Sequence, residues 1–410
     1  MKETGKFGFW SIVLLGINGI VGTGIFLLPN KAYSIIGSAS LGVLLFDAVI
    51  AGCIALCFAE AASLFTRNGG PYLYAKHALG DFWAFEVGVL KWIVTVIAWA
   101  AMAVGFATAL GAAVPALSGD FAKDVISFIL IVGLTIVNIF GVNVSKFVNN
   151  LITISKLVPL ALFIAIGIFF INGANFTPVF PQDTYVDGSF AQAAVLLFFA
   201  YTGFEVIAIA AEDMKNPKKN LPRAIIMCML LVSVLYMAIL AVSIGVYVVL
   251  VGTLISMGGI NFAEAYYAPR VATSMAEDGM LPSALAKRNR YNAPYVAAIV
   301  TAIASVLLAW SGSFTTLAAI SAVSRFTQYL PTCLAVIIFR RKWADKARSY
   351  TIPGGYLIPV IAIGTSLWML AQAQTNQLLW GLGGCIVILP FYYSYWKKKK
   401  AGLIKDHDEM

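Results

Sequence analysis

Runs of about 20 predominantly apolar residues recur along the whole chain, and they constrain its fold more than any other feature. A helix of that length crosses the hydrocarbon core of a bilayer. Only 11% of the residues are charged and 60% are hydrophobic, whereas a soluble domain has about 25% charged residues. No segment between the runs is long enough for a separate soluble domain. The sequence therefore predicts one all-α integral membrane domain, residues 1–410.

Twelve membrane-spanning helices fit the apolar pattern, with boundaries placed to within several residues. They cover approximately 9–36, 41–66, 82–113, 124–141, 147–171, 189–212, 223–247, 250–276, 293–311, 314–340, 356–372 and 376–396. Most of the 28 Lys and Arg residues fall in the termini and in alternate connections, while the opposite connections hold only Lys123. The positive-inside rule then predicts that both termini are cytoplasmic.

This topology accounts for the net charge of +9 without a nucleic-acid partner. We expect a multi-pass protein of the cell (plasma) membrane, specifically a bacterial inner membrane, surrounded by lipid. No obligatory protein partner is evident. The five cysteines all lie in apolar runs and are interpreted as packing residues. His77 and His407 are too few for a histidine-based metal site, so we expect no metal and no cofactor.

A glycine-rich stretch, "GINGIVGTGIF", interrupts the first apolar run at residues 16–26. Each glycine weakens a helix by about 1 kcal/mol relative to alanine. A broken helix exposes N–H groups at one end and C=O groups at the other, which suit an anion and a cation respectively. A zwitterion such as an amino acid needs both. The alternative interpretation is close helix packing through small residues.

A second interruption, Tyr201-Thr202-Gly203, lies in the sixth run, five helices later. Two interrupted helices at matching positions are typical of secondary transporters built from a 5+5 inverted repeat. Helices 1–5 (about 9–171) and 6–10 (about 189–340) would form the two repeats, and helices 11 and 12 (about 356–396) would be peripheral. The argument rests on the positions of the breaks, because no similarity between the halves is visible by eye.

Four motifs, in order, give the chain its family resemblance: "GIVGTGIF", "GGPYLYAKHALG", "FAYTGFE" with "AEDMKNPKKNLPRAI", and "PRVATSMAEDGMLP". The chain resembles the amino acid–polyamine–organocation family of permeases, from about Gly8 to Arg348 and more loosely to the C-terminus. The resemblance implies a LeuT-type fold and sodium-independent, secondary active transport of an amino acid by alternating access. Proton symport and exchange both stay open. The alternatives are an amine, polyamine or cationic amino acid as substrate, or a receptor or a channel.

The resemblance also implies where the substrate carboxylate binds. Backbone N–H groups of Gly22, Thr23 and Gly24 would donate to it, with the Thr23 hydroxyl nearby. An enzyme is not expected, because no clustered carboxylates and no nucleophile with a base stand out in the sequence.

The α-ammonium of the substrate would meet carbonyl groups of Ile20, Phe199, Ala200 and Thr202. Phe199 would also be an aromatic gate over the substrate. Helices 3, 6, 8 and 10 would form the side-chain pocket, near Ala98, Met102, Phe204, Ile260 and Asn261. A cationic substrate would need an acidic side chain in this pocket, and Glu264 is the one acid close to these residues. Because no certain acidic or basic lining is seen, the sequence favours a neutral substrate.

Three charged residues inside apolar runs need a reason, because an unpartnered charge at that depth is costly. Lys156 occupies the place where sodium-coupled relatives bind a cation, and it would tie helices 1, 5 and 8 together or carry a proton. A lysine that reaches the inner membrane surface is the alternative. Glu205 would cap the broken sixth helix or carry a proton, and the cap is favoured. The partner of Arg325 cannot be read from the sequence.

The connection between helices 7 and 8 is unusually short. "YVVLV", residues 247–251, contains no glycine, proline or asparagine, whereas helix connections usually take about 2–8 residues with turn formers. Relative to the family pattern we expect an outer loop of about 20 residues to be missing here.

Overall fold

The computed structural model describes residues 6–140, 142–209, 211–246, 253–311, 321, 324–373, 375, 378–379 and 389–400. Over those ranges the chain is helical, with one isolated β-bridge between Phe7 and Met214. The α-helices are α1 (Phe9–Ile20), α2 (Thr23–Ile36), α3 (Ser40–Ala62), α4 (Pro71–Leu79), α5 (Asp81–Ala113), α6 (Asp120–Ile139), α7 (Val142–Gly167), α8 (Ser189–Tyr201), α9 (Val206–Ile209), α10 (Pro217–Val246), α11 (Thr253–Glu277), α12 (Tyr295–Ser311), α14 (Phe326–Lys342), α15 (Leu357–Gln372) and α17 (Leu389–Lys400).

Several of these helices are long and apolar enough to cross a bilayer. In the described part of the chain five such segments occur, and they are Lys31–Ala62, Asp81–Gly111, Asp120–Ile139, Asn149–Phe170 and Pro217–Gly245. Shorter apolar helices, such as Phe9–Ile20 and Ser189–Tyr201, are pieces of the two interrupted runs. The all-helical, apolar architecture agrees with an integral membrane protein.

The first apolar run is broken where the glycines predicted. Helix α1 ends at Ile20 and α2 begins at Thr23. Between them Val21 is extended (φ −72°, ψ 93°) and Gly22 has φ −134° and ψ −148°, so neither residue is helical. The interruption of span 1 is therefore confirmed. Close packing through small residues is present as well, since a Cβ on Gly16 would lie 2.3 Å from Ile207 Cδ1.

The sixth run is broken as well. Helix α8 ends at Tyr201, α9 begins at Val206, and Gly203 between them has φ +111°. A Cβ atom on Gly203 would lie only 2.1 Å from the main-chain oxygen of Gly19. The two interruptions therefore touch backbone to backbone, at a distance that only glycine permits.

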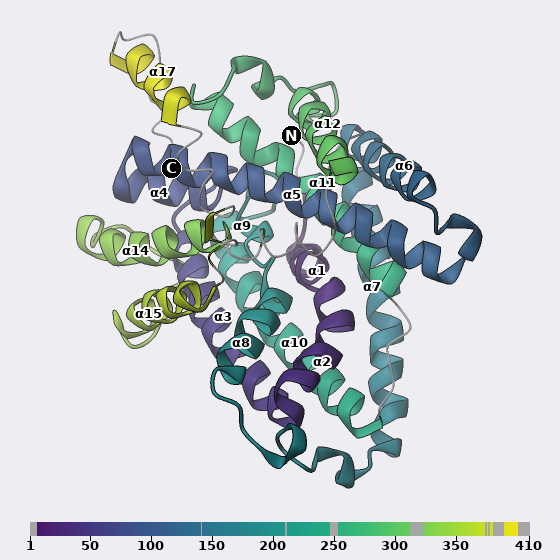
Figure 1. The fold of residues 1–410 in the computed structure, drawn as a ribbon. Coiled ribbons are helices and arrows are strands. Elements are labelled where there is room, and N and C mark those ends of the chain that lie inside the picture. Colours follow the sequence, from purple (N-terminus) through teal and green to yellow (C-terminus); the bar gives the residue numbers. More distant parts are fainter. Residues whose placement is uncertain are drawn as a thin grey trace.

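The helices around these breaks form a bundle with α1 and α2 near its middle (Figure 1). Helix α1 packs on α7, α10 and α11, and α2 packs on α8. Helix α5 lies across α11, and α14 lies beside α15 at one flank. The breaks are thus enclosed by protein on several sides, which is the condition for irregular backbone at membrane depth.

The start of the chain is fastened to the segment that follows α9. The Phe7 N–H donates to the oxygen of Asp213 at 2.8 Å, and the Lys215 N–H donates to the oxygen of Phe7 at 2.9 Å. The Asp213 carboxylate in turn accepts from Arg270 Nε at 2.8 Å and from the Tyr266 hydroxyl at 2.9 Å. We call this contact the N-terminal clasp (Phe7, Asp213, Lys215).

Three sequence expectations about the fold lie wholly or partly outside the described residues. They are the connection between α10 and α11, residues 314–320 and 322–323 of the expected span 314–340, and residues 376–377 and 380–388 of the expected span 376–396. The short "YVVLV" link falls at 247–251, and the structure describes neither 247–252 nor a path between the two helices. The expected missing outer loop stays a prediction here.

Candidate substrate site

A cavity lies between the two interruptions. Its lining comes from both sides of the first break, from α5 and α8, from α11, and from the residues just before α14. The lining residues are Gly19, Ile20, Gly22, Gly24, Ala98, Ala101, Met102, Phe199, Ala200, Thr202, Ile260, Glu264, Ser321 and Arg325.

Most of the predicted substrate-binding residues line this cavity. Six of the seven are among its walls, namely Ile20, Gly22, Gly24, Phe199, Ala200 and Thr202. Only the backbone of the seventh, Thr23, is described, and it begins α2. The structure therefore brings together residues more than 170 positions apart in the sequence. Their role in binding a substrate stays a prediction.

The helix ends at the cavity provide both kinds of main-chain group. The N-cap residue of α2 is Gly22, which has no side chain to cap the first N–H groups of the helix. Gly22 and Gly24, on either side of that terminus, both line the cavity. The carbonyl ends of α1, at Ile20, and of α8, near Ala200 and Thr202, line it too. One cavity is therefore lined by a helix N-terminus, which suits an anionic group, and by carbonyl ends, which suit a cationic group.

Two of the predicted carbonyl groups already have partners. The Ile20 oxygen accepts a hydrogen bond from the Tyr236 hydroxyl at 3.1 Å. The Phe199 oxygen accepts one from the Thr202 hydroxyl at 2.8 Å. The Ile20 oxygen has a second lone pair that can accept from an ammonium group. The Phe199 oxygen also accepts from the Thr202 N–H at 3.2 Å, so both of its lone pairs are already used. Sequence reasoning missed Tyr236, because nothing in α10 indicates which of its faces meets the break.

Lys156 binds the carbonyl end of α1. Its side chain is 1% exposed, and its ammonium donates to the oxygens of Asn18 at 3.0 Å and Val21 at 2.7 Å. The predicted tie between helices 5 and 1 is present, and the alternative of a lysine reaching the membrane surface is wrong. Both hydrogen bonds of Lys156 within the described residues go to the first span, so the expected tie to helix 8 is not part of them.

Other polar contacts extend this tie along α1 and α7. The Asn18 amide donates to Asn149 Oδ1 at 2.9 Å, and the Asn150 amide donates to the Ser11 hydroxyl at 3.0 Å. Buried polar side chains that satisfy each other fix the relative position of two helices. We call this set of contacts, with Lys156, the α1–α7 seam.

Glu205 is the centre of a buried ion cluster. Its carboxylate accepts from Lys91 Nζ at 3.0 Å and from the guanidinium of Arg325. It also accepts from the Gly203 N–H at 3.0 Å and from the Tyr329 hydroxyl at 3.2 Å. Glu205 is fully buried and Lys91 is 2% exposed. The favoured interpretation, a cap on the broken helix, fits the bond to Gly203.

A second acid joins this cluster from α11. Glu264 is 2% exposed, and its Oε1 lies 3.6 Å from Arg325 Nη2. The charged cluster (Lys91, Glu205, Glu264 and Arg325) thus contains two cationic and two anionic side chains. Glu264 and Arg325 also line the cavity, whereas Lys91 and Glu205 do not. The missing partner of Arg325 is therefore identified as this pair of glutamates.

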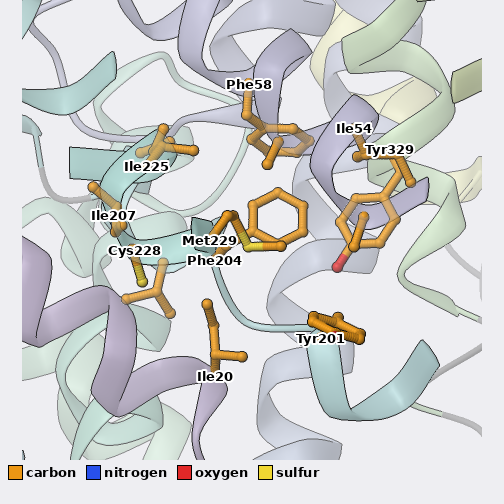
Figure 2. Close-up of a cluster of buried hydrophobic side chains, with 14 of the residues drawn as sticks. Ile20, Ile54, Phe58, Tyr201, Phe204, Ile207, Ile225, Cys228, Met229 and Tyr329 are labelled. Carbon is orange, nitrogen blue, oxygen red and sulfur yellow. The ribbon is translucent and has the colours of Figure 1, made fainter. Parts of the chain in front are cut away.

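Two of the expected side-chain pocket residues are elsewhere. Ala98, Met102 and Ile260 line the cavity, but Phe204 does not. Its ring packs against those of Phe58, with centroids 5.3 Å apart, and Tyr329, at 5.5 Å, inside the apolar cluster of Figure 2. Asn261 is fully buried and is likewise absent from the lining. The unwound segment turns Phe204 away from Phe199, which faces the cavity.

Comparison with known proteins gives consistent results over almost the whole chain. A family model described as amino acid permease matches residues 7–247 and 240–394. An uncharacterized transporter of Mycobacterium tuberculosis, Rv1979c, is 31% identical over 95% of this chain and 91% of its own length. The branched-chain amino acid permease BcaP of Bacillus subtilis is 28% identical over 96% of this chain and 93% of its own length. The serine/threonine exchanger SteT of the same organism is 27% identical over 97% of this chain and 98% of its own length.

Proposed function

Because this chain belongs to the amino acid permease family, we propose that it is a secondary active transporter of a neutral amino acid that works by alternating access. The proposal includes twelve spans, a 5+5 inverted repeat, a plasma-membrane location and cytoplasmic termini. Transport is sodium-independent and runs as proton symport or as exchange. The bound amino acid is carried across unchanged, so no catalytic step is proposed.

One observation carries this proposal more than any other. Two interrupted helices meet at Gly19 and Gly203, and a cavity opens beside them. The N-terminus of α2 supports binding of a carboxylate, and the carbonyl ends of α1 and α8 support binding of an ammonium group. Every α-amino acid carries both groups. A site made from backbone atoms is thereby suited to amino acids as a class.

The charged cluster supports a neutral side chain on the substrate. Its two cations and two carboxylates balance when all four are ionised, so it offers no net charge to a third ion. Burying an additional unpaired charge beside it would be expensive. A second candidate substrate is a cationic amino acid or an amine. It is favoured by the carboxylate of Glu264, which lines the cavity and would attract a cation.

Lys156 supports independence from sodium. Its ammonium occupies the carbonyl oxygens of Asn18 and Val21, which are the kind of hard oxygen ligands that a sodium ion would need. An ammonium held there supplies the positive charge that these two oxygens would otherwise take from a bound metal cation. Substrate binding then requires no second cation.

Counterflow in proteoliposomes tests the proposed function. Vesicles that contain the purified full-length protein are preloaded with an unlabelled mixture of neutral amino acids and diluted into a trace of labelled threonine, valine or leucine. A carrier transiently concentrates label inside, whereas a channel or a receptor does not. The absence of counterflow with all twenty amino acids and with simple amines would overturn the proposal. Empty vesicles are the control.

A further inference from the structure

Within the described part of the chain, three polar side chains in the wall of the cavity each have one atom without a hydrogen-bond partner. These atoms are Oε2 of Glu264, Nε of Arg325 and Oγ of Ser321. The three side chains belong to residues that are 2%, 4% and 1% exposed. All three residues line the cavity between the broken helices. Unpaired polar groups that are buried this deeply are rare in native proteins and call for a missing partner.

The other members of the charged cluster do not supply that partner. Glu205 already holds Lys91 and a terminal nitrogen of Arg325. Glu264 reaches Arg325 only through its other oxygen, at 3.6 Å, which is longer than a hydrogen bond. One carboxylate oxygen, one guanidinium N–H and one hydroxyl are therefore left over at the same wall.

The chemistry of these three groups defines what would satisfy them. A carboxylate oxygen only accepts, a guanidinium N–H only donates, and a hydroxyl does both. The complementary group must therefore donate one hydrogen bond and accept another. A hydroxyl or a carboxamide does so without carrying charge.

Other side chains fit this wall less well. An ammonium group would be attracted to Glu264 but would lie against the guanidinium of Arg325, and a carboxylate would meet the reverse problem. An aliphatic side chain would displace water from all three polar atoms and leave them unpaired. Each unpaired atom then costs the free energy of its desolvation.

We propose that Ser321, Glu264 and Arg325 form a side-chain subsite that selects amino acids with a hydroxyl or carboxamide group, such as serine, threonine, asparagine and glutamine. The subsite deepens the proposed function and rests on it, since it is part of the same cavity. The same cavity also has an apolar lining from Ala98, Met102 and Ile260. Selectivity among neutral amino acids would then come from α11 and the residues before α14, and binding of the α-groups would come from the breaks.

A competition panel on the unmodified protein is the first test. The twenty amino acids compete with labelled threonine for counterflow into proteoliposomes. Hydroxyl and carboxamide amino acids should compete at concentrations about tenfold or more below those needed for valine or leucine, because a site built to hydrogen-bond rejects analogues that cannot. Stronger competition by valine, leucine, lysine or aspartate would overturn the subsite.

Two variants provide the second test. Ser321→Ala and Glu264→Met each remove one partner, and each should lower the ratio of kcat/KM for threonine over valine by about tenfold. Ser366→Ala, a buried serine on α15 bonded to the oxygen of Ala362, is the matched control and should leave the ratio unchanged. Should Glu264→Met fail to fold, Ser321→Ala and the competition panel still decide the question.

The outcomes separate the two proposals. No counterflow with any amino acid overturns the transport function itself. Counterflow of valine as fast as threonine, with an unchanged ratio in Ser321→Ala, overturns the subsite and leaves the transport function intact.

Discussion

The ammonium nitrogen of Lys156 lies 2.7 Å from the main-chain oxygen of Val21, the residue at which α1 gives way to the first interruption. Partial negative charge collects at the carbonyl end of a helix. A cation from α7 therefore neutralises the end of the first half-helix, at a place where the backbone has no helical partner. Lys156 is therefore one of the contacts that hold the break in place, together with the Tyr236 hydroxyl on the oxygen of Ile20.

Removal of that side chain should impair transport. In Lys156→Ala the oxygens of Asn18 and Val21 lose their donor, and each unsatisfied buried group costs about 1–3 kcal/mol. We expect counterflow to fall by at least about tenfold while much of the protein stays folded, as judged by gel filtration in detergent. Lys123→Ala, which removes an exposed ion pair with Asp120, should behave like the unmodified protein. Normal counterflow in Lys156→Ala would contradict this interpretation of the site.

Transport should not depend on sodium. The ammonium of Lys156 already holds the carbonyl oxygens at the end of α1, so no sodium ion is needed there. We expect the initial uptake rate to be the same when sodium is replaced by potassium or choline on both sides of the membrane. Uptake driven by an inward sodium gradient, at constant membrane potential, would refute the prediction.

A side chain at Gly24 should block the cavity. A Cβ there would lie 2.9 Å from Cα and 3.0 Å from Cβ of Ala200, so the backbone of α8 would have to move. Such overpacking costs about 1–3 kcal/mol and separates the two broken helices. We expect Gly24→Val to abolish uptake. Gly133→Val, on α6, meets no atom within 4 Å and is the matched control. Uptake at the normal rate by Gly24→Val, at equal expression, would show that the substrate binds elsewhere.

Removal of Glu205 and removal of Lys91, which form an ion pair in the charged cluster, should lower the stability of the protein by different amounts. In Glu205→Ala two buried cations, Lys91 and Arg325, lose their carboxylate, and an uncompensated buried charge costs about 3–5 kcal/mol. In Lys91→Met the carboxylate of Glu205 keeps Arg325, Gly203 and Tyr329. We therefore expect Glu205→Ala to lower the unfolding temperature in detergent more than Lys91→Met does. The reverse order would contradict the assignment of Glu205 as the centre of the cluster.

The sequence was sufficient to locate the interruptions. Glycine weakens a helix locally, so the effect is visible in the stretch that contains it, and residues 9–36 contain the break at Val21 and Gly22. The seven predicted substrate-binding positions follow from the same local motifs. Six of them line one cavity because the two breaks come together.

The partners of the buried charges could not be predicted. Lys91 and Arg325 are 114 and 120 positions from Glu205, and only the packing of separate helices brings them into contact. Phe204 was expected near the side-chain pocket, and it is absent from the cavity lining for a different reason. Residues 202–205 are not helical, so the helical period that would relate Phe204 to Phe199 does not apply to them.

The N-terminal clasp has a consequence for how the motion of α1 could be observed. Because Phe7 is hydrogen-bonded on both sides to Asp213 and Lys215, a tilt of α1 must either carry the segment after α9 with it or open both bonds. Those two amide protons are therefore a natural pair of markers for the conformational cycle. If the bonds open, the exchange of both amides with solvent deuterium should accelerate together, at the frequency with which the half-helix swings. The exchange rates of these two amides would then report the proposed gating step, and the measurement needs no attached label.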